Sequence, residues 1–299
     1  MSDGGEGFLD AWSGSLHEIT LPDPWGVPQR VPYRLRALPD GGVAAFVEAA
    51  SVIGYRPGQQ RSSASALEAS SAPLGTLLAH LAEQGVRSIT CGVGGTATSD
   101  GGLGCFDAAG DLSDVQLLAA VDVLLPYRGA LDFAPQKGID ASDLDEVARR
   151  LTFASHHFAT VAHVDVEQVA GAGSGGGVGG ALLALGATVD SGFSVVAREH
   201  DVGDAAARAA VVITGEGRLD ASSLQGKVVG GILAATPAAT PVVIVCGSAD
   251  RRTIRELSDL DRRIVVADCT ESFGASAAYN RTRSCVRDLI VETVQQLTG

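Results

Sequence analysis

The spacing of apolar residues predicts a chain in which short strands alternate with helices. In the last third, apolar runs of strand length occupy residues 209–213, 242–246 and 263–267. Helical spacing separates and follows them over residues 226–236, 251–259 and 275–297. Short strands alternating with helices pair in parallel through right-handed crossovers, so this region is predicted to be a parallel α/β sheet.

The first two thirds have a different pattern. Strands are predicted at 14–21, 31–38 and 43–48, and the turn residues between them favour an antiparallel meander. Residues 56–72 are rich in Ser, Ala and Gln and are predicted to be loop. Beyond them we expect helices at 74–84, 141–160 and 178–186 and strands at 87–93 and 116–125. The fold class is therefore α/β.

Composition narrows the classes of function. The 299 residues suffice for one large or two medium domains, and the net charge of −13 excludes the dense basic surface that nucleic-acid binding needs. The five cysteines show no zinc or disulfide spacing, and no apolar run is long enough to span a membrane. We expect a cytoplasmic protein that binds a small molecule; its oligomeric state does not follow from the sequence.

A first glycine-rich loop follows the strand at 87–93. Its small residues, which include Gly94, Gly95 and Thr96, allow the backbone to approach a ligand and to form a nest of N–H groups that suits an anion. Asp100 is the acidic residue of this loop. It could act as a base or hold Mg²⁺; alternatively, it caps the next helix.

A second glycine-rich loop spans residues 171–180 and contains G-x-G-x-x-G. That motif alone is a weak indication of a dinucleotide site, because glycine-rich stretches match it by chance. Phosphate binding through the backbone at Gly173, Gly175 and Gly176 is one interpretation. Tight helix packing through small residues is the other.

A third motif, Thr214-Gly-Glu-Gly-Arg-Leu-Asp220, is predicted to follow a parallel strand, where ligands of open α/β sheets bind. It carries Glu216, Arg218 and Asp220, and Gly226-Lys227 opens the next helix. Arg218 could instead form a surface ion pair with a neighbouring acid. Smaller candidates are Asp3 and Glu6 at the N-terminus and Asp122 at the end of a strand.

The chain has only two lysines, Lys137 and Lys227, and each adjoins a glycine. Codon bias explains most of the shortage. A compact ammonium group nevertheless suits a phosphate in a way that arginine does not reproduce, so at least one of the two is a candidate ligand-binding residue.

Together these segments resemble the bacterial type I glycerate kinase family. The matching stretches, in the family's order, are Ser2–Gly7, Gly92–Gly102, Phe133–Gly138, Gly171–Gly177 and Ile213–Asp220 with Gly226-Lys227. The resemblance implies ATP-dependent phosphorylation of D-glycerate or a related hydroxy acid. It also implies a Rossmann-like domain from residues 1–12 and 190–299, an inserted α/β domain from residues 13–189, and an active site in the cleft between them.

The sequence departs from the family pattern at several points. Family members place a strand, an Asp-Ser loop, a helix and a second strand before the Asp-Gly-Gly-Glu-Gly motif, whereas here Met1 stands just before it, so part of the sheet and of the active site is expected to be missing. Pro73 stands where the family has a residue with a backbone N–H. Leu74 stands where the family has a residue with a hydroxyl group. The Asn expected after Asp122, and the one before the Asp100 motif, are absent.

Kinase chemistry needs positioned phosphates, neutralised charge and an oriented hydroxyl. The loops would supply backbone donors; Lys137, Arg218 or Lys227 would supply positive charge. Asp100 or Asp220 would orient the hydroxyl or hold Mg²⁺. Two alternatives stay open: a family member that binds a nucleotide or organic acid without turnover, and an NAD-linked enzyme.

Overall fold

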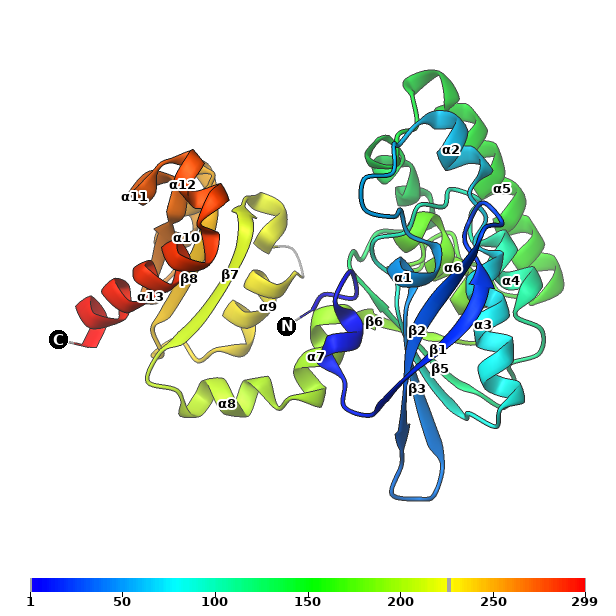
Figure 1. Cartoon of the computed structure of the whole chain (residues 1–299), viewed down its shortest axis with the longest axis horizontal. Helices are drawn as coiled ribbons and strands as arrows, with labels where there is room; N and C mark the ends of the chain where they lie inside the picture. The colour runs from blue at the N-terminus through cyan, green and yellow to red at the C-terminus, as the bar shows by residue number, and fades with distance from the viewer. Residues whose placement is uncertain (1, 225–226, 299) are drawn as a thin grey trace. The chain divides into compact units, whose positions relative to one another are not determined.

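The computed structural model describes residues 2–224 and 227–298 and divides into two compact units, Met1–Val196 and Ala197–Gly299. Each unit is described by itself (Figure 1). Residues 2–12 lie in the first unit. Gly226 of the Gly226-Lys227 motif lies outside the described residues.

The first unit is built on a six-stranded mixed sheet in which the strands follow one another in sequence order. The strands are β1 (Ser15–Pro22), β2 (Pro28–Ala37), β3 (Val43–Glu48), β4 (Ser88–Gly92), β5 (Gln116–Val121) and β6 (Thr188–Ser191). The first two pairings are antiparallel, which confirms the predicted meander. From β3 to β6 the pairings are parallel, so the carboxyl ends of these strands share one edge.

Successive side chains of β3 point to opposite faces of this sheet and so join two different apolar cores. Ala45 and Val47 join the larger core, and Ala44 and Phe46 join a smaller one. The helices that supply the larger core are α1 (Ala49–Ile53), α2 (Ser63–Glu68), α3 (Ala72–Glu83), α4 (Leu103–Ala108), α5 (Leu144–Val161) and α6 (Val178–Ala184). The smaller core receives Phe8 and Val196, from the turn η1 (Phe8–Ala11) and from α7 (Gly192–Glu199).

The stretch predicted to be loop at 56–72 contains α2, which the sequence pattern did not reveal. Ser62 caps this helix, because its hydroxyl oxygen accepts a hydrogen bond from the Ser65 backbone N–H. The Ser65 hydroxyl oxygen in turn accepts a hydrogen bond from the Ser62 backbone N–H. A reciprocal cap made by two serines is easily overlooked, since the usual partner residue is Glu or Gln.

The second unit holds a three-stranded parallel sheet of β7 (Val212–Leu219), β8 (Val242–Ala249) and β9 (Ile264–Asp268). Its helices are α8 (Val202–Arg208), α9 (Val228–Ala235), α10 (Arg251–Ser258), α11 (Cys269–Phe273), α12 (Ala275–Asn280) and α13 (Thr282–Thr298). The parallel α/β prediction is confirmed here. Two details differ: β7 extends through Leu219, so most of the third motif is strand, and the long helix is interrupted at Arg281.

Two findings bear on the predictions from composition. Across the described part of the chain, no helix has the length and apolar character needed to cross a bilayer. All five cysteines are free and buried, and burial raises the pKa of the Cys91 thiol to about 12. These thiols therefore belong to the core.

Candidate active site

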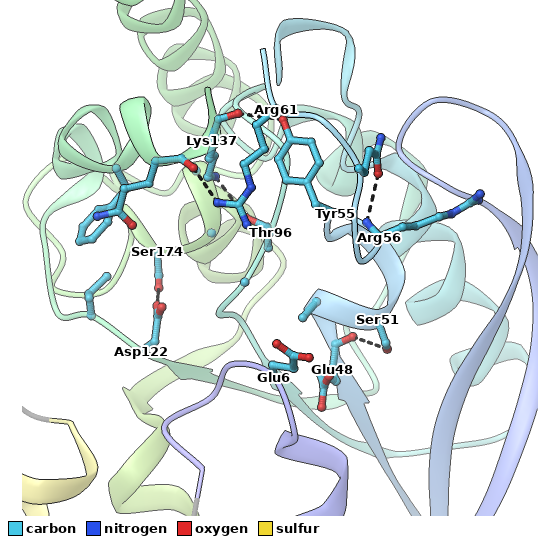
Figure 2. Close-up of a pocket in the computed structure, with 18 of the residues that line it drawn as sticks. Glu6, Glu48, Ser51, Tyr55, Arg56, Arg61, Thr96, Asp122, Lys137 and Ser174 are labelled. Atoms are coloured by element: carbon cyan, nitrogen blue, oxygen red, sulfur yellow. Dashed lines mark hydrogen bonds between the residues drawn. The ribbon is translucent and has the colours of Figure 1, made fainter. Parts of the chain in front are cut away.

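A cavity of about 650 Å³ opens in the first unit at the carboxyl ends of its parallel strands (Figure 2). Glu48 ends β3, Thr96 lies in the loop after β4, and Asp122 follows β5. Ligands of α/β sheets bind at this edge, where the loops after several strands converge. The predicted site residues that line the cavity are Glu6, Gly95, Thr96, Asp122, Lys137, Gly173, Gly175 and Gly176.

Lys137 supplies a buried positive charge to this cavity. Its side chain is 9% exposed, and its Nζ donates hydrogen bonds to Thr96 Oγ1 at 3.2 Å and to the Thr98 carbonyl oxygen at 2.5 Å. Burial lowers the pKa of Lys137 to about 8, against the attraction of Asp100 and Asp122, which raises it. An ammonium group has three N–H donors, so one is left for a ligand.

The segment that carries Lys137 is fastened to the loop that follows α1. Tyr55 donates from its hydroxyl to the Lys137 carbonyl oxygen at 2.8 Å, and Arg61 Nη1 donates to the Gln136 carbonyl oxygen at 2.8 Å. The Arg61 guanidinium lies over the Tyr55 ring at 5.2 Å. Figure 2 shows both side chains beside Lys137. These contacts hold the lysine's backbone in place from outside.

Carboxylates line the part of the cavity nearer to the sheet. Asp122 Oδ1 accepts a 2.7 Å hydrogen bond from the Ser174 hydroxyl, as Figure 2 shows. Burial raises the pKa of Asp122; the Ser174 bond and Lys137 oppose that rise, and Asp3 adds to it. The pKa of Glu48 is also raised, by burial and by Glu6, although backbone N–H groups that include that of Leu9 lower it.

The first two glycine loops pack against each other and against the N-terminal turn. Gly94 donates its N–H to the Gly4 carbonyl oxygen at 2.9 Å. Gly176 has φ of +74°, and a Cβ there would overlap the Thr98 carbonyl oxygen. A Cβ on Gly102 would lie 2.6 Å from the Gly177 carbonyl oxygen. Close packing therefore requires many of these glycines, in addition to any role that Gly175 and Gly176 have at the cavity.

Asp100 does not line this cavity. Its Oδ2 accepts hydrogen bonds from the Ser71 N–H at 2.8 Å and the Ser71 hydroxyl at 2.7 Å, and its Oδ1 accepts the Gly102 N–H at 3.0 Å. The carboxylate thus ties the start of α3 to the first glycine loop. Asp3 and Gly94 likewise lie beside the lining residues and outside the lining itself.

The predicted residues of the second unit lie on β7 and in the segment that follows it, and Arg218 is the most exposed of them. Arg218 and Asp220 make an ion pair of 3.9 Å with side chains 76% and 40% exposed. Asp220 Oδ1 also accepts from the Ser222 hydroxyl at 2.7 Å, and this contact lowers the pKa of Asp220. Lys227 donates to Ser222 Oγ at 3.3 Å, and Glu216 lies on β7.

A metal site built by the protein alone would need several His, Cys, Asp or Glu side chains close together. Among residues 2–224 and 227–298, no group of three or more His, Cys, Asp or Glu side chains could hold an ion. Mg²⁺ bound together with a nucleotide would need only one or two protein carboxylates, because phosphate and water would supply its other ligands. Glu6, an exposed carboxylate at the cavity, is a suitable protein ligand of that kind.

Sequence reasoning missed several lining residues. They are Glu48, Ser51, Tyr55, Arg56, Arg61, Phe133, Gln136 and Ser174. A signal existed for part of this set: Tyr55, Arg56 and Arg61 stand in a loop that immediately follows the third predicted strand and its short helix. The sequence pattern predicts β3 only as part of an antiparallel meander. The parallel pairing of β3 with β4 in the structure shows that this loop lies at the carboxyl ends of the parallel strands, where ligands bind.

A mixed sheet whose parallel strands end at a charged cavity is typical of small-molecule-binding proteins of the α/β class. The chain belongs to the glycerate kinase family, whose model matches residues 1–111 and 108–298.

Three similar proteins illustrate this membership. Glycerate 2-kinase of Escherichia coli K12 is 30% identical over 83% of this chain and 75% of its own length. An uncharacterized protein of Mycobacterium bovis is 36% identical over 85% and 71%, respectively. A crystal structure of a candidate glycerate kinase 2 from Salmonella typhimurium LT2 superimposes with a TM-score of 0.67 at 28% identity, covering 99% of this chain and 88% of that one.

Proposed function

We propose that this protein is an ATP-dependent kinase that phosphorylates D-glycerate or a related small hydroxy acid. The observation that carries the proposal is the cavity at the carboxyl ends of β3, β4 and β5, where the buried ammonium of Lys137 and the carboxylate of Asp122 line the same space. A hydroxy acid presents a negative carboxylate and a neutral hydroxyl. A site with one buried cation and one hydrogen-bond acceptor is complementary to that pair.

In this proposal the remaining N–H of Lys137 binds the negative charge of the acid or of the transferred phosphoryl group. Burial strengthens this interaction, because water screens it less. ATP supplies the phosphoryl group, and Mg²⁺ would be held by its phosphates and by Glu6. The predicted supply of positive charge by Arg218 and Lys227 belongs to the same proposal, as do the predicted Rossmann-like and inserted domains.

The test is release of ADP, followed in a coupled assay with ATP, Mg²⁺ and a panel of hydroxy acids: D-glycerate, L-glycerate, D-lactate and glycolate. We expect turnover with D-glycerate above the others. Stabilisation by ATP or D-glycerate in thermal melts without any ADP release would instead establish a binding protein. Binding of NAD⁺ in calorimetry, with none of ATP, would contradict the kinase proposal.

A further inference from the structure

Three carboxylates line the cavity, those of Glu6, Glu48 and Asp122, and the structure separates them by their contacts. Asp100 lies outside the lining and is bonded by Ser71 and Gly102. Glu48 accepts the Leu9 N–H at 3.1 Å and so fixes the N-terminal turn. Glu6 and Asp122 remain.

Asp122 differs from Glu6 in the way it is held. Its Oδ1 is fixed by one neutral donor, the Ser174 hydroxyl, and Ser174 itself lines the cavity. Its Oδ2 faces the Gly94 backbone, where a Cβ would come within 3.2 Å. A bulkier residue at position 94 would therefore press on this oxygen. Glu6 is exposed and has no comparable anchor among the described side chains.

We propose that Asp122 is the catalytic base that accepts the proton of the hydroxyl being phosphorylated, and that Ser174 is its positioning residue. This inference rests on the proposed kinase function. The hydroxyl oxygen forms a bond to the γ-phosphorus of ATP, and the bond from that phosphorus to the bridging oxygen breaks, with ADP leaving. The hydroxyl proton passes to Asp122 and then to water, which restores the carboxylate.

Groups around Asp122 favour this role. Burial and Asp3 raise its pKa, which makes the carboxylate a stronger base than an exposed aspartate, while Lys137 and Ser174 keep it from rising further. Asp122 and Lys137 line the same cavity, and each shifts the pKa of the other. One molecule can therefore give its hydroxyl to the carboxylate while its anionic group meets the ammonium.

The test compares Asp122→Asn with the wild-type protein. A neutral amide keeps the shape but cannot take the proton, so we expect kcat to fall by about 100-fold or more, within the range typical for loss of a general base. Dissociation constants for ADP and D-glycerate should stay within about threefold, since the amide oxygen of Asn can still accept a hydrogen bond from the substrate hydroxyl. Asp111→Asn, an exposed change of the same kind, is the matched control and should leave kcat unchanged.

The Ser174→Ala variant supplies a second test, which stays valid even where the Asp122→Asn protein fails to fold. The Ser174 bond lowers the pKa of Asp122, so its loss should move the acidic limb of the kcat profile to higher pH, with a fall in kcat of about tenfold. An unmoved limb, or an Asp122→Asn protein with more than half the wild-type kcat, overturns the inference while the kinase proposal stands. Wild-type protein without turnover on any hydroxy acid overturns both.

Discussion

The two lysines of this chain stand beside glycines in similar sequence contexts, yet the structure gives them different surroundings. Lys137 is buried in the first unit, bonded to Thr96 and to the Thr98 carbonyl oxygen, and burial lowers its pKa to about 8. Lys227 begins α9 in the second unit and makes one exposed 3.3 Å bond to Ser222.

The difference shows how depth changes what a single charge can do. A buried ammonium already has fixed partners and interacts strongly with any anion that reaches it, because little water screens the charge. An exposed ammonium on a flexible stem contributes less, and salt weakens it. The buried lysine is therefore expected to carry the larger share of anion binding, and the following experiments are ordered by how strongly they probe that expectation.

Replacement of Lys137 by Met should have the largest effect. Loss of a preorganised donor in a buried site lowers kcat/KM by about 100- to 1,000-fold, whereas Lys227→Met should lower it by about tenfold or less. ADP release at saturating ATP measures both. Thermal melts control for folding, and equal losses in the two variants would remove the distinction between the lysines.

Glycine replacements compare how tightly the backbone packs in the unit that holds Lys137 and in the unit that holds Lys227. Gly176→Ala places a Cβ against the Thr98 carbonyl oxygen at a φ of +74°, so we expect the free energy of unfolding to fall by roughly 2–3 kcal/mol. Gly217→Ala, in the motif of the second unit, meets nothing within 4 Å and should change it by less than about 1 kcal/mol. Urea unfolding measures both values; a tolerated alanine at 176 would show that the two glycine loops need not pack so closely.

The pH dependence of kcat/KM should distinguish the two lysines as well. Lys137 loses its proton as pH rises through about 8, so kcat/KM should fall about tenfold per pH unit above that value. The Lys227→Met variant should show the same fall in kcat/KM. The ordinary lysine pKa is 10.5, so between pH 8 and 10.5 the unfolded chain holds the extra proton. The free energy of unfolding should therefore rise with pH across this window by up to about 3 kcal/mol.

Lys137→Met should abolish that rise in stability, which urea titrations at several pH values would detect. A rise that persists in this variant would assign the titration to another group and contradict the buried-lysine interpretation.

The smallest expected effect comes from Tyr55→Phe, which removes the hydroxyl that bonds the Lys137 carbonyl oxygen. Loss of one such bond is worth about 0.5–1.5 kcal/mol, so kcat/KM should fall about three- to tenfold. The readout is KM for the hydroxy acid, because the tyrosine hydroxyl holds the backbone of the lysine that binds the anion. An unchanged KM would mean that the Lys137 backbone is held sufficiently by its other contacts.

Several elements followed directly from local pattern. The meander of β1 to β3, the helix α5 and the strands β8 and β9 appear close to where apolar spacing placed them, whereas β7 begins at Val212, three residues after the predicted start. The extension of β7 through Leu219 did not follow from this pattern, because the alternating charges of Glu216 and Arg218 resemble a loop until pairing with β8 satisfies their backbone groups. Helix α2 was missed because two serines form its cap.

The sequence by itself determined the α/β class, the family motifs and the residue types that can meet an anion. These follow from periodicity and from the backbone freedom of glycine, which are local properties. Only the tertiary structure decided which acids and bases share a cavity. It placed Asp100 on Ser71 and Asp122 on Ser174, and it buried Lys137 in a segment held by Tyr55 and Arg61. Such choices depend on contacts between residues as much as 82 positions apart, which no local pattern encodes.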